Sequence, residues 1–374
     1  MKNNKFLIFL LIFSILLSSF ALPVYATELE EGEDAADASG DTAEDLPEVD
    51  EPAPEEKFSL DAGAALLIEL NSDTIVYELN ADEQIYPASL TKIMTCLVAL
   101  DLCEDLSESV TVTQSALDGL DPDGVTVSLV PGEILSMEEL LYCMMVPSAN
   151  DACTVIAEHL CGSVDAFVDK MNEKAVELGC TSTHFVNPDG LHEDEHYTTV
   201  NDLYIITKAA LKNELFCELT STTVHTVPAT NLSDSRTVHT TNYLLSADIN
   251  PDYYYEKARG VKTGYTSRAG RCLISTVQEG DYYYPSIVTG CDTKINDDGS
   301  VVYESFVQTK KLLEYGLNNF SFVTALSKLL PVAQVPVTKA AVSSVVIAPL
   351  DDIVALLPTE YMEEKITSNY ELSG

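Results

Sequence analysis

The sequence YPASLTK, residues Tyr86–Lys92, is followed directly by the apolar run Ile93–Leu100, which contains no Gly or Pro. Such a run is typical of a buried helix. Residues three apart share one face of a helix, so Ser89 and Lys92 are expected side by side at its N-terminus. A serine hydroxyl becomes a nucleophile when a base takes its proton, and an amine can be that base if burial or another cation lowers its pKa. Surface helices carry the same spacing by chance, so the interpretation depends on the rest of the chain.

The first 26 residues predict a secretory signal peptide. Lys2 and Lys5 precede an apolar core, Phe6–Leu17, and Val24-Tyr25-Ala26 offers a small-residue cleavage site. Residues 27–57 are rich in Asp, Glu, Ala and Pro, a composition that predicts an acidic disordered linker. We therefore expect an exported protein that acts outside the cytoplasm, in the cell envelope.

Composition excludes several classes of partner and site. The formal net charge of −40 argues against binding to nucleic acid or electrostatic attraction to anionic lipid. The nine cysteines are odd in number, scattered and without a C-x-x-C pair, so neither a disulfide framework nor a zinc or redox site is expected. Residues 360–374 do not have the pattern of an amphipathic anchoring helix, so the visible C-terminus does not support membrane anchoring.

Hydrophobic periodicity predicts an α+β fold over residues 58–320. An early hairpin and three later strands would form one antiparallel sheet, with helices packed on its faces and a helical lobe inserted between the two groups of strands. Residues 321–374 predict the start of a small all-β domain. Expected strands are Ala64–Glu69, Thr74–Leu79, Gly260–Thr266, Arg271–Val277, Tyr282–Gly290, Leu330–Val337 and Ala341–Ala348; expected helices are Ser136–Met145, Asn150–Leu160, Val164–Leu178, Thr199–Lys212 and Val302–Leu317, with loop at Asp118–Gly132.

Two further motifs add to the Ser89 helix. Ser148-Ala149-Asn150 lies between two predicted helices, where a turn can point a hydroxyl and an amide into a cleft. Lys262-Thr263-Gly264 lies on a predicted strand, where a lysine supplies positive charge for a substrate carboxylate and a glycine lets a substrate backbone approach. The order Ser-x-x-Lys, Ser-x-Asn, Lys-Thr-Gly on a helix, a loop and a strand is very hard to obtain by chance.

With these motifs the chain resembles the low-molecular-weight penicillin-binding proteins, the serine D-alanyl-D-alanine carboxypeptidases, over Phe58–Phe320. Supporting stretches are Pro131-Gly132-Glu133, Phe185–Leu191, Tyr197–Asp202 and Gly260–Thr266.

The resemblance implies a role for each residue. Ser89 would form an acyl-enzyme with the penultimate D-Ala, Lys92 would act as its base, and Ser148 would pass a proton to the leaving D-Ala. Asn150 would hold Lys92 or the substrate amide. Lys262 and Thr263 would bind the terminal carboxylate beside Gly264, and the backbone N–H groups of Ser89 and Tyr265 would form the oxyanion hole. The partners implied are peptidoglycan stem peptides ending in D-Ala-D-Ala and inhibitory β-lactams, with no cofactor and no metal.

Other readings stay open at this point. A D,D-endopeptidase would use the same residues, and a β-lactamase would need an additional Glu, for which Glu193 and Glu195 are candidates. His192–His196 matches the zinc motif H-E-x-x-H, but its flanks predict a loop, whereas the motif needs a helix. A β-lactam sensor or a peptidoglycan-binding module would acylate without turnover; such sensors carry a transmembrane signalling segment, which the sequence does not show.

Overall fold

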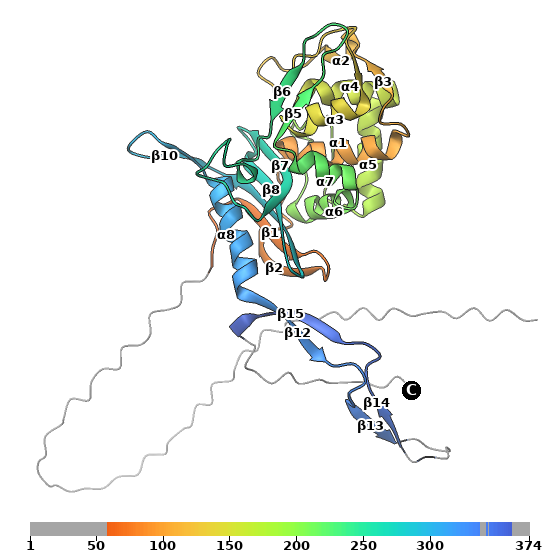
Figure 1. Cartoon of the computed structure of the whole chain (residues 1–374), viewed down its shortest axis with the longest axis vertical. Helices are drawn as coiled ribbons and strands as arrows, with labels where there is room; N and C mark the ends of the chain where they lie inside the picture. Colours follow the sequence, from red (N-terminus) through yellow and green to blue (C-terminus); the bar gives the residue numbers. More distant parts are fainter. Residues whose placement is uncertain (1–57, 337–341, 343, 361–374) are drawn as a thin grey trace, which may run out of the picture. The chain divides into compact units, whose positions relative to one another are not determined.

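The structure, a computed structural model, describes residues 58–336, 342 and 344–360, so the predicted signal peptide and linker lie outside the described residues. Its centre is an antiparallel sheet of five strands in the order β2-β1-β9-β8-β7 (Figure 1). The early hairpin joins the late strands because β1 pairs with β9. The predicted sheet is confirmed, and no predicted strand end differs by more than about two residues from the observed one. The strands are β1 (Ala64–Glu69), β2 (Thr74–Leu79), β7 (Ala258–Thr266), β8 (Gly270–Glu279) and β9 (Tyr282–Cys291).

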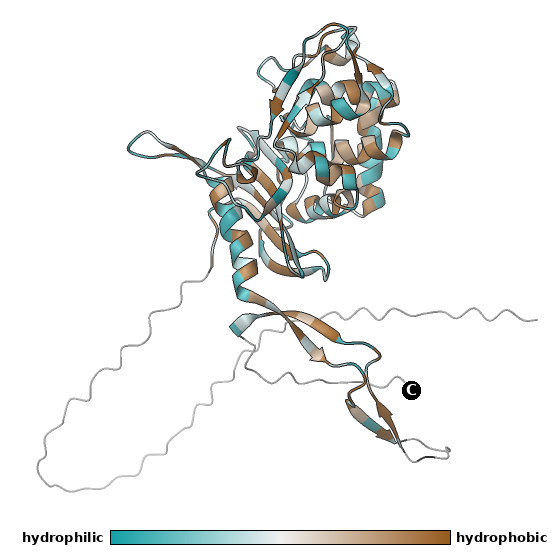
Figure 2. Ribbon diagram, in the orientation of Figure 1, coloured by the Kyte–Doolittle hydropathy of each residue, from teal (hydrophilic) through white to brown (hydrophobic). Residues whose placement is uncertain are grey.

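Side chains of the central strands alternate between two apolar cores. In β1, Leu66 and Ile68 belong to one cluster, while Ala65 and Leu67 belong to the other. Because side chains alternate along a strand, each face of this sheet needs its own cover. The helical lobe covers the first face and α8 (Glu304–Asn319) covers the second. Helix α8 accordingly carries both hydrophobic and hydrophilic residues along its length (Figure 2).

Helix α1 lies in the middle of the helical lobe, where it packs against α3, α4, α5 and α6. Its residues Thr91 to Ala99 are all buried, which explains why its sequence has no polar face. The side chains of Ser136, Ser163 and Thr199 accept backbone N–H groups and begin α3, α5 and α6. The predicted helices are confirmed. The helices of the lobe are α1 (Thr91–Leu102), α2 (Gln114–Leu117), α3 (Met137–Met145), α4 (Asn150–Cys161), α5 (Val164–Leu178), α6 (Val200–Ala210) and α7 (Glu214–Ser221).

Several short elements were not predicted, because ladders of three or four residues are too short to show a period. Two single turns of 3-10 helix, η1 (Ala88–Leu90) and η2 (Tyr243–Leu245), are likewise too short to show a period in the sequence. The loop expected at Asp118–Gly132 is confirmed. The unpredicted strands pair as β3 (Ser109–Thr111) with β4 (Ile134–Ser136), β5 (Val224–Val227) with β6 (Arg236–His239), and β10 (Thr293–Ile295) with β11 (Val301–Tyr303).

The C-terminal region is all-β, as predicted, although its strands begin and end elsewhere. β12 (Phe320–Leu326) pairs with β15 (Ile353–Pro358), and β13 (Ala333–Pro336) pairs with β14 (Ser344–Ile347). Val337 and Ala341, which were assigned to the last predicted strands, lie outside the described residues. Within the described part of the chain, no helix is both long enough and apolar enough to cross a membrane.

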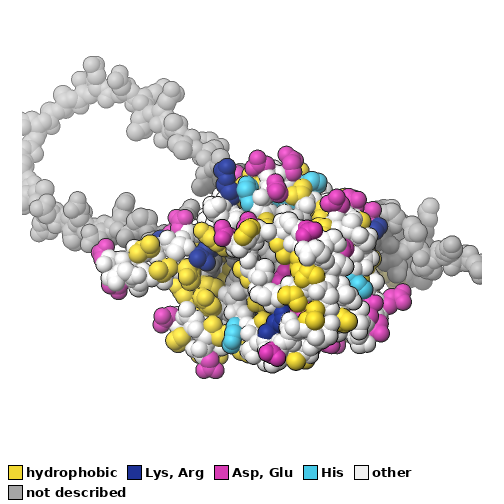
Figure 3. Space-filling model, turned by 90° about the horizontal axis from the view of Figure 1, so that it is seen from above, with side chains coloured by type: hydrophobic (Ala, Val, Ile, Leu, Met, Phe, Trp, Pro, Cys, Tyr) yellow, Lys and Arg dark blue, Asp and Glu magenta, His cyan; other side chains and the backbone are white. Residues whose placement is uncertain are grey.

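All nine cysteines lie in the described part of the chain, and none of them is paired in the structure. Burial raises the pKa of several of their thiols, that of Cys153 to about 12. Acidic side chains are spread over the face seen in Figure 3, where Lys and Arg are found at a few points, in keeping with the net charge of −40.

Candidate active site

Ser89 lies on η1, immediately before α1, and Lys92 lies in the first turn of α1. The Nζ of Lys92 is 3.0 Å from the Oγ of Ser89. Lys92 is completely buried, although it is among the longest and most polar side chains of the lobe. The structure therefore brings the two residues together as their spacing predicted, in surroundings where a charged amine is costly.

Three oxygen atoms surround the Lys92 amine. Besides Ser89, it donates to the Oδ1 of Asn150 at 2.8 Å and to the backbone carbonyl of Asp189 at 2.6 Å. Both of these oxygens accept hydrogen bonds and cannot donate. A neutral amine has two N–H groups and one lone pair, so these two acceptors take the N–H groups and leave the lone pair for the hydroxyl of Ser89. The geometry thus fits an amine that accepts the serine proton.

The carbonyl of Asp189 belongs to a turn formed by Asn187–Gly190. The side chain of Asn187 accepts the backbone N–H of Gly190 at 2.7 Å, which closes the turn. Gly190 has a positive φ of 87°, and a Cβ there would lie 1.9 Å from the carbonyl oxygen of Ala88. The turn therefore rests against the backbone next to Ser89, and only glycine fits. The contact of this turn with Lys92 could not be predicted from the sequence, since a backbone carbonyl leaves no signal in side-chain chemistry.

The Ser148 motif lies between α3 and α4. Ser148 is nearly buried and has a positive φ of 70°, a left-handed conformation that costs a non-glycine residue about 1–2 kcal/mol. Asn150 is the first residue of α4, and its backbone N–H donates to the carbonyl of Val125 at 2.7 Å. The adjacent Asp151 accepts N–H groups of Val127 and Leu129, so the 118–132 loop is fixed beside the site.

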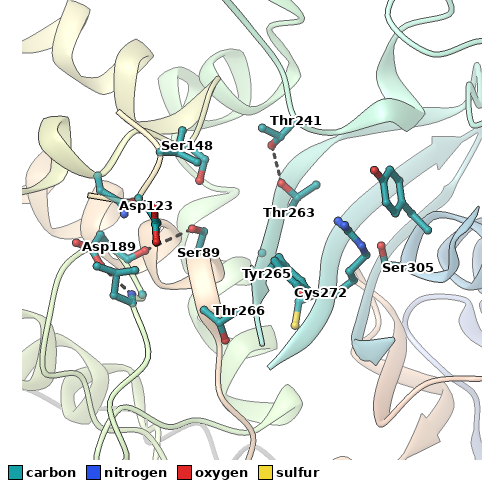
Figure 4. A pocket seen from close by; sticks show the side chains of 18 of the residues that line it. Ser89, Asp123, Ser148, Asp189, Thr241, Thr263, Tyr265, Thr266, Cys272 and Ser305 are labelled. Carbon is teal, nitrogen blue, oxygen red and sulfur yellow. Dashed lines mark hydrogen bonds between the residues drawn. The ribbon is translucent and has the colours of Figure 1, made fainter. Parts of the chain in front are cut away.

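The third motif lies on β7, opposite η1. A Cβ on Gly264 would lie 3.2 Å from the backbone nitrogen of Ser89, so the strand approaches the nucleophile closely. The hydroxyl of Thr263 is 2.5 Å from that of Thr241, and Tyr265 is 58% exposed at the edge. Figure 4 shows Ser89 and Ser148 facing Thr263 and Tyr265 across the pocket.

Lys262, the first residue of the Lys-Thr-Gly motif, is buried and does not line the pocket, so its role toward the substrate carboxylate stays a prediction. It is 2% exposed, and its Nζ donates to the carbonyl of Thr263 at 3.2 Å. Burial, together with the nearby charge of Lys92, holds the pKa of Lys262 well below its usual range. Side chains alternate along β7, so Lys262 points to the buried side of the strand while Thr263 meets the pocket.

One cavity of about 370 Å³ is lined by residues of all three motifs: Ser89, Ser148, Asn150, Thr263 and Gly264. Among the described residues that line it, the carboxylates are those of Asp123 and Asp189. Asp189 accepts the backbone N–H of Leu191 at 2.8 Å. Glu193 and Glu195 are exposed and are not part of the lining, so neither is placed to activate a water for a β-lactamase.

The segment His192–His196 is a loop with a turn and not a helix. His196 is buried; its Nε2 is 2.8 Å from the Oγ1 of Thr91, and its Nδ1 accepts the backbone N–H of Val186 at 3.2 Å. Both ring nitrogens are therefore engaged, and the N–H on Nε2 is directed at the first residue of α1. Burial and neighbouring positive groups lower the pKa of His196 to about 3, which keeps the ring neutral.

A Ser–Lys pair at a helix start, a Ser–Asn loop and a Lys-Thr-Gly strand around one cavity define a class of serine hydrolases that form acyl-enzymes and react with penicillin. A model of the D-alanyl-D-alanine carboxypeptidase family, peptidase family S11, matches residues 49–293. The chain belongs to this family, and its assignment as a serine-type D-Ala-D-Ala carboxypeptidase is confirmed at that level.

Among curated proteins, the chain is similar to the D-alanyl-D-alanine carboxypeptidase DacF of Bacillus subtilis, with 32% identity over 75% of this chain and 68% of that protein. It is 31% identical to DacC of Escherichia coli, over 72% of this chain and 64% of that protein. A D-alanyl-D-alanine endopeptidase of Escherichia coli is 29% identical over 57% of this chain and 66% of its own.

Among solved structures, penicillin-binding protein 5 of Haemophilus influenzae has a TM-score of 0.66 and 27% identity, covering 83% of this chain and 86% of that one. The DD-transpeptidase of Streptomyces K15 has a TM-score of 0.62 and 27% identity, covering 70% of this chain and 99% of that one. The fold and the family therefore agree.

Proposed function

We propose that this chain removes the terminal D-alanine from peptidoglycan stem peptides through an acyl-enzyme on Ser89, and that β-lactams acylate the same serine. The observation that carries the proposal is the set of hydrogen bonds around Lys92. Asn150 and the carbonyl of Asp189 accept N–H groups of this amine, whose Nζ lies 3.0 Å from the Oγ of Ser89, so in its neutral form the lone pair is free to take the serine proton.

In this mechanism, Lys92 takes the proton of Ser89 as the Oγ attacks the carbonyl of the penultimate D-Ala. The backbone N–H groups of Ser89 and Tyr265 stabilise the oxyanion, an interaction of roughly 3–4 kcal/mol per donor in known cases. Ser148 passes a proton to the nitrogen of the departing D-Ala. Water then attacks the ester carbonyl, and the same groups return the proton to Ser89 as the shortened peptide leaves.

Lys262 is buried and does not line the cavity, so it acts on this proton transfer through its amine and not by touching the substrate. Two ammonium groups close together in a buried site repel each other, so the pair favours states in which one amine is neutral. The lowered pKa of Lys262 reflects this repulsion as well as burial. Thr263 supplies a hydroxyl to the substrate at the pocket surface, and Gly264 leaves room for its backbone.

The proposed domain organisation follows the sequence. A signal peptide (1–26) and an acidic linker (27–57) precede the catalytic domain (58–320), and the start of a β-rich region (321–374) follows it. Peptidoglycan lies outside the cytoplasmic membrane, so a protein that acts on it works extracytoplasmically. Export by a cleaved signal peptide would produce a mature chain that begins near residue 27.

The test is incubation of the purified protein with a labelled penicillin, followed by digestion and mass spectrometry of the labelled peptide. We expect the label on Ser89 and no label on the Ser89→Ala variant. Labelling of Ser89→Ala at the rate of the unchanged protein would contradict the assignment.

The second candidate function is D,D-endopeptidase activity, which the similarity to the Escherichia coli endopeptidase favours. It requires the same acylation chemistry, but the leaving group is an amino group of the neighbouring stem peptide in place of a free D-alanine. Rates on a linear pentapeptide and on a purified cross-linked dimer distinguish the two functions. We expect the linear peptide to be the better substrate.

A further inference from the structure

One side of the active-site cavity is held in place by a hairpin that carries none of the three motifs. Gly124 and Val125, from the 118–132 loop, line the cavity. The hairpin of β5 and β6 lies beside α3 (Figure 1). Its residues, 224–239, are all described and none of them is part of the lining. Any effect of the hairpin on catalysis must therefore pass through the loop.

The tip of the hairpin binds the segment that follows the loop. The side chain of Asn231 accepts the backbone N–H of Ile134 and donates to the carbonyl of Gly132, both at 2.9 Å, as a neighbouring strand would. The hydroxyl of Thr230 donates to the carboxylate of Glu133 at 3.0 Å. Glu133 is completely buried, so its charge needs a partner inside the protein.

Arg236, the first residue of β6, is that partner, and it also holds the loop. One guanidinium nitrogen donates to the carbonyl of Val127 at 2.7 Å, and the other pairs with the carboxylate of Glu133. The Arg236 side chain is 16% exposed, so the pair is largely shielded from water. A guanidinium can hold two acceptors at fixed angles because its N–H groups form a rigid fork. Arg236 therefore fixes the loop backbone two residues after Val125.

The part of the loop that Arg236 fixes rests on Asn150. The carbonyl of Val125 accepts the backbone N–H of Asn150 at 2.7 Å. A Cβ on Gly124 would lie 2.9 Å from the Nδ2 of Asn150, so the loop backbone lies against the amide of this side chain. The Oδ1 of the same amide accepts the Lys92 amine at 2.8 Å. If the loop moved away, the amide could turn over and present N–H donors to Lys92 in place of its oxygen.

We propose that Arg236 is a positioning residue for acylation: by holding the carbonyl of Val127, it keeps the loop against Asn150, so that the oxygen of this amide faces Lys92. Arg236 acts through three consecutive contacts, from the guanidinium to the loop, from the loop to Asn150, and from Asn150 to the amine. Asp151 also binds the loop, through the N–H groups of Val127 and Leu129. Loss of Arg236 should therefore loosen the loop without releasing it.

The inference rests on the proposed acylation of Ser89, and the test follows that step with a labelled penicillin in the purified protein and four variants. Arg236→Met removes both contacts of the guanidinium, and Arg236→Lys keeps the charge. Glu133→Gln breaks the ion pair but leaves Arg236 free to hold the loop. The matched control is His225→Phe on the same hairpin, which keeps the ring stacked on α3 and removes its hydrogen bond to that helix.

Two readouts separate positioning from loss of the fold. Unfolded protein lowers the final fraction of protein that is labelled, whereas a misplaced Asn150 lowers the first-order rate constant at saturating penicillin. We expect Arg236→Met to reach full labelling with a rate constant lowered about 10- to 100-fold, in line with the cost of a misplacement of about 1 Å. Arg236→Lys should recover part of the rate. Glu133→Gln and His225→Phe should stay within about threefold of the unchanged protein.

Several results would overturn the positioning role. They are an unchanged rate constant in Arg236→Met, a loss confined to the labelled fraction, and an equal loss of rate in Glu133→Gln or His225→Phe. Absence of labelling in the unchanged protein, or labelling of Ser89→Ala at the same rate, would instead overturn the proposed function.

Discussion

The turn that holds Lys92 can be tested by replacing Gly190 with alanine. A Cβ there would lie 1.9 Å from the carbonyl oxygen of Ala88, whereas real Cβ contacts stay above 3.0 Å. The turn or the backbone of Ala88 must therefore move by about 1 Å. The hydrogen bond from Lys92 to the carbonyl of Asp189, now 2.6 Å, would then exceed hydrogen-bonding distance. Since a 1 Å misplacement of reacting groups costs about 100-fold in rate, Gly190→Ala should lower the acylation rate by about that factor.

The assay is the second-order rate constant for acylation by a fluorescent penicillin, with thermal unfolding measured in parallel. Gly179→Ala is the matched control, because Gly179 also has a positive φ, 91°, but a Cβ there meets nothing within 4 Å. Both variants should lose about 1–2 kcal/mol of stability to the left-handed backbone. Only Gly190→Ala should also lose acylation. If its acylation rate stayed within about threefold of that of Gly179→Ala, the proposed role of the turn would be wrong.

Three more predictions follow from the site. Lys262→Met keeps the side-chain volume and removes the amine. It should lower kcat/KM at neutral pH by about 100-fold or more, and it should move the acidic limb of the pH–rate profile to higher pH because repulsion between the two amines is lost. An unshifted profile with a near-normal rate would contradict this prediction. Chelation by EDTA should leave acylation unchanged, because both ring nitrogens of His196 are engaged; loss of acylation that zinc restores would contradict this. The pKa of His196 in the folded protein, about 3, is below its value of 6.5 when unfolded, so its contribution to stability is present above pH 6.5 and is lost as the pH falls toward 3. The loss should reach about 2 kcal/mol at pH 5, and His196→Gln should flatten the measured dependence of the unfolding free energy on pH.

The elements that build the site could be predicted because their sequence signals are local. The hairpin Ala64–Glu69 and Thr74–Leu79 shows two short apolar runs around a polar turn, and α5 has a serine cap at its start and a glycine after its end. Such signals come from the residues that form the element, so no knowledge of tertiary contacts is needed. The three-residue spacing of Ser89 and Lys92 is also a local signal.

What the sequence could not predict depends on contacts between distant segments. The carbonyl of Asp189 reaches Lys92 across 97 positions of the chain. His196 was seen as a chance match to a zinc motif, yet it is buried beneath the start of α1. Arg271 lay at the start of a correctly predicted strand, but its place in the cavity depends on register with β7 and on packing against Tyr303. The position of a backbone carbonyl and the identity of a stacking partner cannot be read from the neighbouring residues in the sequence.

Burial of the two lysines separates proton transfer from contact with the substrate. Lys92 and Lys262 are buried and lie outside the lining of the cavity, whereas Thr263, the next residue on β7, lines it. Because side chains alternate along a strand, one short motif places an amine on the buried side and a hydroxyl at the pocket surface. Removal of the Lys262 amine should therefore lower kcat more than it raises KM.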